Sequence, residues 1–239
     1  ILCPGKTVIM PDEHAGCPMA SMITERELRE KKKLFPNARV VCYVNTTAAV
    51  KAESDVCCTS SNAVEIVSSI PEDEEILFIP DKSLGAYVSS CLNREMIYWE
   101  GYCPTHHRIL AEQIVKMKSE HPAAEVVVHP ECTPDVIALA DHVASTTGII
   151  KYAGSSNKKE FIIGTETGIL HRLRKEYPDK TFMPVTPLSD CPNMKLNTLE
   201  KIYIALKYEQ PELLMDESLI LAAKKPIIRM LELSSKFGL

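Results

Sequence analysis

Apolar runs alternate with amphipathic segments along most of the chain. A charged amphipathic segment beginning at Thr24 is stopped by Pro36, and a run rich in β-branched and aromatic residues follows at 38–45. The first two elements are therefore a helix and a strand. The same alternation predicts further helices at 46–54 and 61–70 and further strands at 55–60 and 74–81. Strands joined by helices of this length predict a parallel sheet with right-handed crossovers and helices on both faces.

The pattern then occurs a second time. It predicts strands at 126–131, 142–146 and 160–165 and helices at 133–141 and 147–154. Cys-Pro pairs mark the repeat, because Cys17, Cys103 and Cys191 are separated by 103 − 17 = 86 and 191 − 103 = 88 residues. The expected fold class is α/β, with three small three-layer αβα domains of parallel sheet in a pseudo-threefold arrangement. We expect one repeat at 17–102, one at 103–190, and the remainder of a third at 1–16 plus 191–239.

The third unit is expected to lack its first strands. Residues 6–11 match 180–184, the last strand of the second unit, so they are predicted to be the last strand of a preceding unit. Thr198 is predicted to open a helix over 199–213, after which no apolar strand follows. We therefore expect the missing strands to lie upstream of Ile1 and the chain to be N-terminally incomplete.

Charge and composition favour a small-molecule partner. The 239 residues carry 27 basic and 32 acidic side chains, a net charge of −5, with no long block of one sign, so nothing predicts binding to nucleic acid or to an anionic membrane. No apolar run is long enough for a bilayer, and the first residues do not resemble an export signal. Nine cysteines, an odd number, then indicate reduced thiols and a cytoplasmic location.

The three repeated cysteines predict a metal centre. Each follows a strand and precedes a helix start, and functional groups gather at the carboxyl ends of parallel strands. Helix dipoles are expected to favour the thiolates. Zinc would normally take a fourth protein ligand, and none occurs in a matching place, whereas a [4Fe-4S] cluster on three cysteines leaves one iron open as a Lewis acid. The alternative is that the three are buried small side chains.

Packing is the expected role of Cys42, Cys57, Cys58 and Cys132, while Cys3 and Cys91 suggest no role.

Polar residues follow the strands at equivalent positions in both units. They are Tyr43, Asn45 and Ser60 in the first unit and His129, Glu131 and Thr146 in the second. They offer hydrogen-bond donors and one acid/base pair, and hydroxyls at helix starts suit a carboxylate or a phosphate. The alternative is that the hydroxyls only cap helices, with Ser60 or Ser61 capping the helix at 61–70.

These residues lie in motifs that resemble one family. The motifs are GCPMASM at 16–22, YVN at 43–45, TSSNA at 59–63, FIPDKSL at 78–84, GYC at 101–103, HPEC at 129–132, AST at 144–146 and NMK at 193–195. Together they resemble the quinolinate synthase family of NAD biosynthesis. The resemblance extends from about Lys6 to the C-terminal helix.

The resemblance implies three α/β domains around a [4Fe-4S] cluster on the central axis, with Cys17, Cys103 and Cys191 as its ligands. It implies the condensation of iminoaspartate with dihydroxyacetone phosphate to quinolinate, with loss of phosphate and water. Tyr43, His129 and Glu131 would move protons. The implied substrate-binding residues are Tyr43, Asn45, Ser60, His129, Glu131 and Thr146.

The chain departs from the family pattern in two places. The family's His-Asn-Tyr and Gly-Asp-Ser motifs have no match here, in keeping with the missing first strands. Val185 and Leu188 stand where some relatives carry further cysteines, so no disulfide switch is expected.

Lys195 is a candidate for binding phosphate, and a link to the aspartate-oxidising enzyme is plausible because iminoaspartate hydrolyses readily. Another three-cysteine hydro-lyase and a non-catalytic iron–sulfur sensor remain alternatives.

Overall fold

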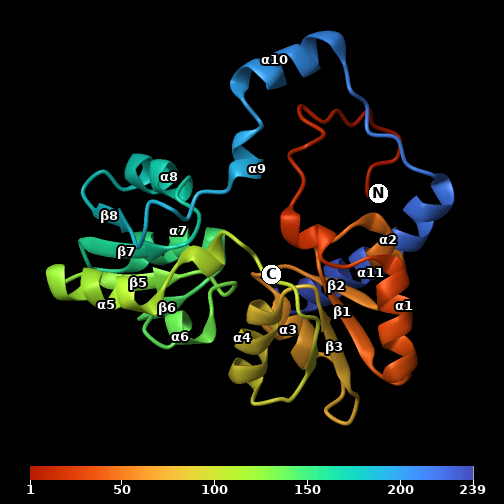
Figure 1. Ribbon diagram of the computed structural model, residues 1–239, viewed down its shortest axis with the longest axis horizontal. Coiled ribbons are helices and arrows are strands. Elements are labelled where there is room, and N and C mark those ends of the chain that lie inside the picture. Colours follow the sequence, from red (N-terminus) through yellow and green to blue (C-terminus); the bar gives the residue numbers. More distant parts are fainter. Residues whose placement is uncertain (239) are drawn as a thin grey trace.

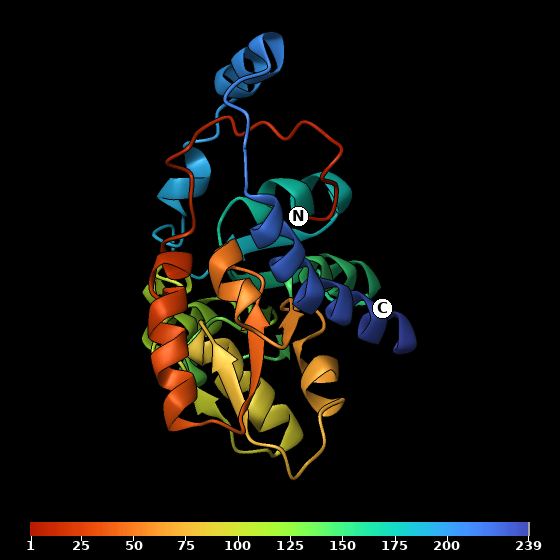
Figure 2. The ribbon, with the colours of Figure 1, turned by 90° about the vertical axis from the view of Figure 1, so that its right-hand side faces the viewer.

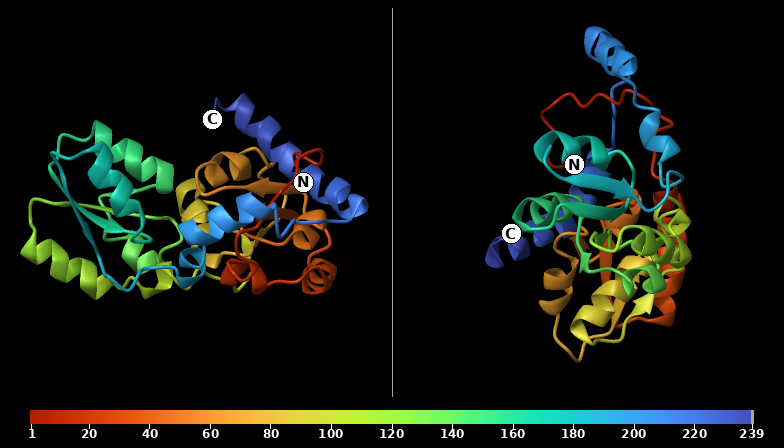
Figure 3. Two further views of the ribbon diagram at one scale, coloured as in Figure 1. Left: turned by 90° about the horizontal axis from the view of Figure 1, so that it is seen from above. Right: turned by 90° about the vertical axis from the view of Figure 1, so that its left-hand side faces the viewer.

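The computed structural model describes residues 1–238 and shows an α/β fold (Figure 1). Two four-stranded parallel sheets have strand orders β2-β1-β3-β4 and β6-β5-β7-β8. The two units that carry them lie side by side (Figure 3). Because strand order and direction are the same in both sheets, the structural repeat predicted from the sequence is confirmed.

The first sheet forms from short, mostly apolar strands. Its strands are β1 (Arg39–Tyr43), β2 (Val56–Cys58), β3 (Ile76–Ile79) and β4 (Ile97–Tyr98). Val41 of β1 pairs with Val56 on one side and with Phe78 on the other, so β1 is central and buried. The helix α1 (Glu25–Leu34) precedes β1, and the helices between the strands are α2 (Ala48–Ala52), α3 (Ala63–Ser68) and α4 (Lys82–Leu92).

The second sheet is packed on both faces. Its strands are β5 (Glu125–Val128), β6 (His142–Val143), β7 (Glu160–Gly164) and β8 (Thr181–Pro184). Its helices are α5 (Ala111–Glu120), α6 (Pro134–Ile137), α7 (Thr146–Ser155) and α8 (Ile169–Glu176). Val127 and Ile163 pack in a core with residues of α7 and α8, whereas Val126 and Ile162 pack in another with residues of α5 and α6. Successive strand residues point to opposite faces, which gives the three-layer αβα arrangement.

Two helix starts show how local sequence sets the element bounds. Thr24 and Glu27 form a reciprocal capping box at the start of α1, as the sequence pattern favours. The prediction that Ser60 or Ser61 caps the next predicted helix is wrong, because Asn62 is the N-cap of α3. The Asn62 side-chain oxygen accepts a hydrogen bond from the Thr59 amide at 2.6 Å. Ser60 consequently stays available to line a cavity.

The C-terminal helices run away from the second unit and return to the first. These helices are α9 (Pro192–Lys195), α10 (Leu199–Tyr208) and α11 (Glu217–Lys236). Figure 2 shows α10 projecting beyond the two sheets, whereas α11 lies along the first unit. There α11 packs on α2 and β2 and buries Ile227, Met230 and Leu233. The predicted helix at 199–213 ends early, because Glu209 adopts a left-handed conformation with a φ of 53°.

The strand predicted at 6–11 is not formed. Ile9 makes only an isolated antiparallel bridge with Glu212, and no other residue among 1–238 extends this pairing into a sheet. The pseudo-threefold arrangement and the three-domain division therefore stay predictions. Within residues 1–238, no helix is both long enough and apolar enough to cross a membrane.

Candidate functional site

The candidate site lies at the carboxyl ends of the central strands of both sheets. The two central strands are β1 and β3 in one sheet and β5 and β7 in the other. From each central pair the chain continues to opposite edges of the sheet, so the strand order reverses between these two strands. Ligands of open parallel sheets bind at such points. Tyr43 is the last residue of β1, His129 and Glu131 follow β5, and Thr165 follows β7. These ends open into one cavity of about 510 Å³.

All nine predicted site residues line this cavity. They are Cys17, Tyr43, Asn45, Ser60, Cys103, His129, Glu131, Thr146 and Cys191. Sequence reasoning missed five further polar residues of its wall, which are Thr105, His106, Thr165, Glu166 and Asn193. Residues that lie far apart along the chain thus form a single lining.

A connected set of buried polar groups forms the deepest part of the cavity. The Tyr43 hydroxyl donates to Glu131 Oε1 at 2.5 Å, across the boundary between the two units. Glu131 Oε2 lies 3.1 Å from His106 Nδ1, an ion-pair distance, although the two atoms are not aligned for a hydrogen bond. On the far side of the ring, His106 Nε2 shares a 2.9 Å hydrogen bond with Thr165 Oγ1. The His129 ring stacks on His106 with centroids 4.6 Å apart.

Burial and neighbouring groups set the protonation states of this set. Burial alone would raise the pKa of Glu131, but His106, His129 and the Tyr43 hydroxyl outweigh burial and hold this pKa below its usual value. Burial, with a smaller effect of His106, lowers the pKa of His129 to about 3. Burial and then Glu131 raise the pKa of Tyr43 well above its usual value. At neutral pH the site therefore holds a carboxylate, a neutral imidazole and a protonated phenol.

Asp81 is a second buried carboxyl group at the edge of the site. It follows β3, is fully buried, and caps α4 by accepting from the Leu84 amide at 2.8 Å. Its other oxygen, Oδ2, has no hydrogen-bond partner. Burial, followed by the charge of Glu131, raises the pKa of Asp81 to about 8. Asp81 lies two residues after β3, the position that Glu166 occupies after β7.

The three repeated cysteines are free, half-buried thiols at the starts of short helical turns. Cys17 precedes the 3₁₀ turn η1 (Pro18–Ser21), Cys103 lies shortly before η2 (His106–Arg108), and Cys191 precedes α9. Burial raises the pKa of Cys17 and of Cys103. Backbone amides of the turns that follow lower both pKa values, in the direction expected at helix starts, but burial outweighs them.

Hydrogen bonds tie the loops that carry these cysteines to one another. Asn193 Nδ2 donates to the Gly16 carbonyl at 2.9 Å, which joins the loop of Cys191 to that of Cys17. Arg108 Nη1 donates to the Asp190 carbonyl at 3.3 Å, which joins the loop of Cys103 to that of Cys191. The three loops are thus held around one cavity.

The donor set of the cavity suits a soft or borderline metal centre. Three thiols line one cavity, and ligand atoms of Cys103, His106 and Glu131 all lie within 4.8 Å of one another. Lys195 also reaches the cavity, where its ammonium pairs with Glu166 at 3.2 Å. The four cysteines assigned to packing, Cys42, Cys57, Cys58 and Cys132, are fully buried as predicted.

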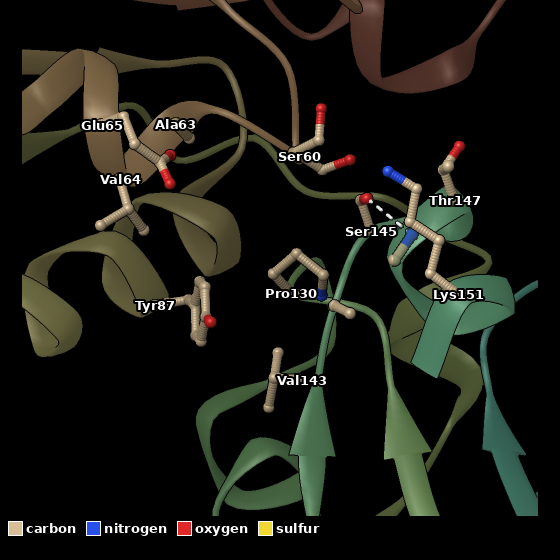
Figure 4. A pocket seen from close by; sticks show the side chains of 13 residues that line it. Ser60, Ala63, Val64, Glu65, Tyr87, Pro130, Val143, Ser145, Thr147 and Lys151 are labelled. Carbon is tan, nitrogen blue, oxygen red and sulfur yellow. Dashed lines mark hydrogen bonds between the residues drawn. The ribbon is translucent and has the colours of Figure 1, made fainter. Parts of the chain in front are cut away.

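A second cavity of about 480 Å³ adjoins the first (Figure 4). Ser60 lines both cavities, and Pro130, which lies between His129 and Glu131, forms part of the wall of the second. Tyr87 of the first unit and Lys151 of the second also line this space. The second cavity thus reaches the backbone that carries the buried polar set.

Comparisons with known proteins agree with the motifs. The family model described as quinolinate synthetase A protein matches residues 1–232. The quinolinate synthase of Methanosarcina barkeri is 52% identical over 231 residues, which are 97% of this chain and 76% of the relative. That of Caldicellulosiruptor saccharolyticus is 51% identical over 235 residues, which are 98% of this chain and 77% of the relative. That of Thermodesulfovibrio yellowstonii is 50% identical over 236 residues, with 98% and 78% covered.

Proposed function

The chain belongs to the quinolinate synthetase A protein family, which makes it an enzyme of NAD biosynthesis, and we propose that it condenses iminoaspartate with dihydroxyacetone phosphate to quinolinate. Phosphate and water are the other products. The observation that supports this proposal most strongly is that one cavity collects all nine residues implied by the family resemblance. A cavity of about 510 Å³ is also of the size that small-molecule sites have.

We propose that Cys17, Cys103 and Cys191 hold a [4Fe-4S] cluster in this cavity. Three free, half-buried thiols from three separate loops fit that role, and the loops are already tied together by Asn193 and Arg108. When bound, such a cluster would supply one iron without a protein ligand as a Lewis acid for substrate oxygen atoms.

Tyr43, His129 and Glu131 would move the protons of the reaction. The Tyr43 hydroxyl oxygen lies 2.5 Å from Glu131 Oε1, so Tyr43 can donate its proton while Glu131 accepts one in return. His129 is neutral at pH 7 because burial lowers its pKa to about 3, and a neutral imidazole can accept a proton. The site thus offers both a donor and acceptors for imine formation, isomerisation and dehydration.

The remaining predicted residues would orient the substrates. Thr146 is the first residue of α7, a ten-residue helix whose free amide groups and positive end favour a carboxylate or phosphate. Ser60 lies opposite in the first unit and Asn45 follows β1, and both line the same cavity. We propose that these three side chains bind the anionic groups of the substrates, with Lys195 as the candidate for the phosphate.

The proposal extends to the cellular setting. Iminoaspartate hydrolyses readily, so a functional link to the aspartate-oxidising enzyme that produces it would shorten its time in water. A reduced, cytoplasmic location would suit nine cysteines of which none is paired among residues 1–238.

Quinolinate formation by the anaerobically prepared full-length protein, loaded with its cluster, tests the function. We expect Tyr43→Phe and Glu131→Gln to lower the rate by about 100-fold or more, since a positioned acid or base contributes roughly 10²–10⁴-fold. Tyr87→Phe is the matched control, because this tyrosine lines only the second cavity, and it should keep the wild-type rate. A fully loaded protein that makes no quinolinate would contradict the proposal. Turnover of a different hydroxy acid would then favour a hydro-lyase, and no turnover at all a sensor.

A further inference from the structure

We propose that the cluster-free protein binds one zinc ion through Cys103 Sγ, His106 Nδ1 and Glu131. The ligand atoms of these three residues lie within 4.8 Å of one another, and the residues are buried or half-buried rather than on an open acidic surface. Cysteine, histidine and glutamate are ordinary zinc ligands, and three protein ligands with one open position are typical of a reactive zinc site. This site would share Cys103 with the proposed cluster but would not use Cys17 or Cys191.

His106 Nδ1 is the observation that calls for a cation. The imidazole side chain is only 9% exposed, and Nδ1 has no hydrogen-bond partner although it lies 3.1 Å from Glu131 Oε2. In the tautomer that donates from Nε2 to Thr165, Nδ1 presents a lone pair toward a carboxylate oxygen. In the other tautomer Nδ1 carries a proton toward Glu131, and in either case a metal ion between the two atoms would be coordinated by both.

The distances suit a tetrahedral ion with small side-chain adjustments. Zinc bond lengths of about 2.0–2.3 Å place tetrahedral ligand atoms roughly 3.3–3.7 Å apart. The His106–Glu131 separation of 3.1 Å is close to this range, and the upper bound of 4.8 Å for the group requires Cys103 to move by no more than about 1 Å. Rotation of a half-buried cysteine side chain supplies such a movement.

The outer contacts of the ligands are also those of a metal site. Thr165 Oγ1 fixes the His106 ring through Nε2 at 2.9 Å, which leaves Nδ1 for the metal. The Tyr43 hydroxyl occupies Glu131 Oε1 at 2.5 Å, which leaves Oε2 for the metal. On ligation the Cys103 thiol loses its proton to solvent. The two positive charges of the zinc ion then balance the negative charges of the Cys103 thiolate and the Glu131 carboxylate.

Zinc binding has a consequence for assembly of the cluster. Because Cys103 would belong to both sites, a chain that holds zinc could not take up the cluster until the ion leaves. This consequence rests on the proposed cluster ligands, whereas zinc binding by the cluster-free chain does not.

A zinc titration of the cluster-free full chain against a chromophoric chelator tests the site. We expect one ion per wild-type chain, a loss of affinity of more than about 100-fold in His106→Ala, and a loss of roughly 10–100-fold in Thr165→Val, as found when outer partners of metal ligands are removed. His107→Ala is the matched control and should bind as the wild type does, because the His107 ring stacks on Tyr102 and contacts Ser83 instead.

Cobalt substitution identifies the ligands directly. The cobalt-loaded chain should show a thiolate-to-cobalt charge-transfer band that Cys103→Ser removes and that Cys17→Ser and Cys191→Ser leave in place. If Cys17→Ser and Cys191→Ser abolish binding while His106→Ala does not, the ion is held by the three cysteines and the proposal is overturned. Should His106→Ala fail to fold, the cobalt spectra of the three serine variants still decide between the two ligand sets. Neither result depends on whether the loaded enzyme makes quinolinate.

Discussion

The hydrogen bond between Tyr43 and Glu131 should contribute measurably to the stability of the cluster-free protein. Tyr43 is 6% exposed and Glu131 is 3% exposed, and the phenol donates to a carboxylate oxygen at 2.5 Å. A buried hydrogen bond to a charged group contributes about 1.5–3 kcal/mol. Tyr43→Phe removes only the hydroxyl, so we expect it to lower the free energy of unfolding by about 2 kcal/mol at pH 7.

Urea unfolding at pH 7, followed by circular dichroism, measures this loss. Tyr152→Phe is a matched control, because Tyr152 also donates to a glutamate, Glu125, at 3.0 Å but in a partly exposed position. Exposure weakens such bonds, so the control should lose less than about 1 kcal/mol. A Tyr43→Phe protein as stable as the wild type, or no less stable than Tyr152→Phe, would refute the argument that a buried, charged acceptor makes this bond strong.

Three further substitutions test other parts of the structure. The pKa of His129 is lowered to about 3, so its contribution to stability is present above the usual pKa of 6.5 and is lost as the pH falls toward 3. We expect His129→Gln to reduce the pH dependence of the free energy of unfolding on the acid side by on the order of 4 kcal/mol, measured by urea titrations at several pH values. Gly101→Ala should cost about 1–3 kcal/mol of unfolding free energy, since the added Cβ would lie 2.5 Å from the Pro80 carbonyl oxygen, and an unchanged melting temperature would contradict this. Leu233→Ala, in the buried face of α11, should lower the free energy of unfolding by about 2–5 kcal/mol. Leu231→Ala, at a residue that is 45% exposed on the same helix, should lower it by less than about 0.5 kcal/mol. Equal losses by chemical denaturation would show that α11 does not pack on the first unit as described.

The repeat made most of the sheet architecture predictable. Two runs of apolar strands with matching Cys-Pro pairs define two equivalent units, and parallel sheets with helical crossovers follow from their spacing. The position of α11 could not be predicted in this way. Its apolar positions indicate a buried face, but helical periodicity does not say which of several apolar surfaces that face will cover.

The missed site residues follow a rule that was applied to only part of the chain. Polar residues after the first strand of each unit, such as Tyr43 and His129, were identified from their place at a strand end. Thr165 directly follows β7, and Asp81 and Glu166 each lie two residues after β3 and β7, so a place at a strand end also marks these residues. His106 carried no such signal, because it depends on the turn that follows Cys103 and on its contact with Glu131 in tertiary structure.

The central claim is that three loops distant in the sequence hold one cluster in the cavity between the two units. The most direct test is the iron content and absorption spectrum of anaerobically reconstituted Cys103→Ala, compared with Cys91→Ala, which removes an exposed cysteine that does not line the cavity. We expect about four irons per chain for the wild type and for Cys91→Ala and no stable cluster for Cys103→Ala. A Cys103→Ala protein that retains a full cluster would contradict the ligand set and with it this account of the site.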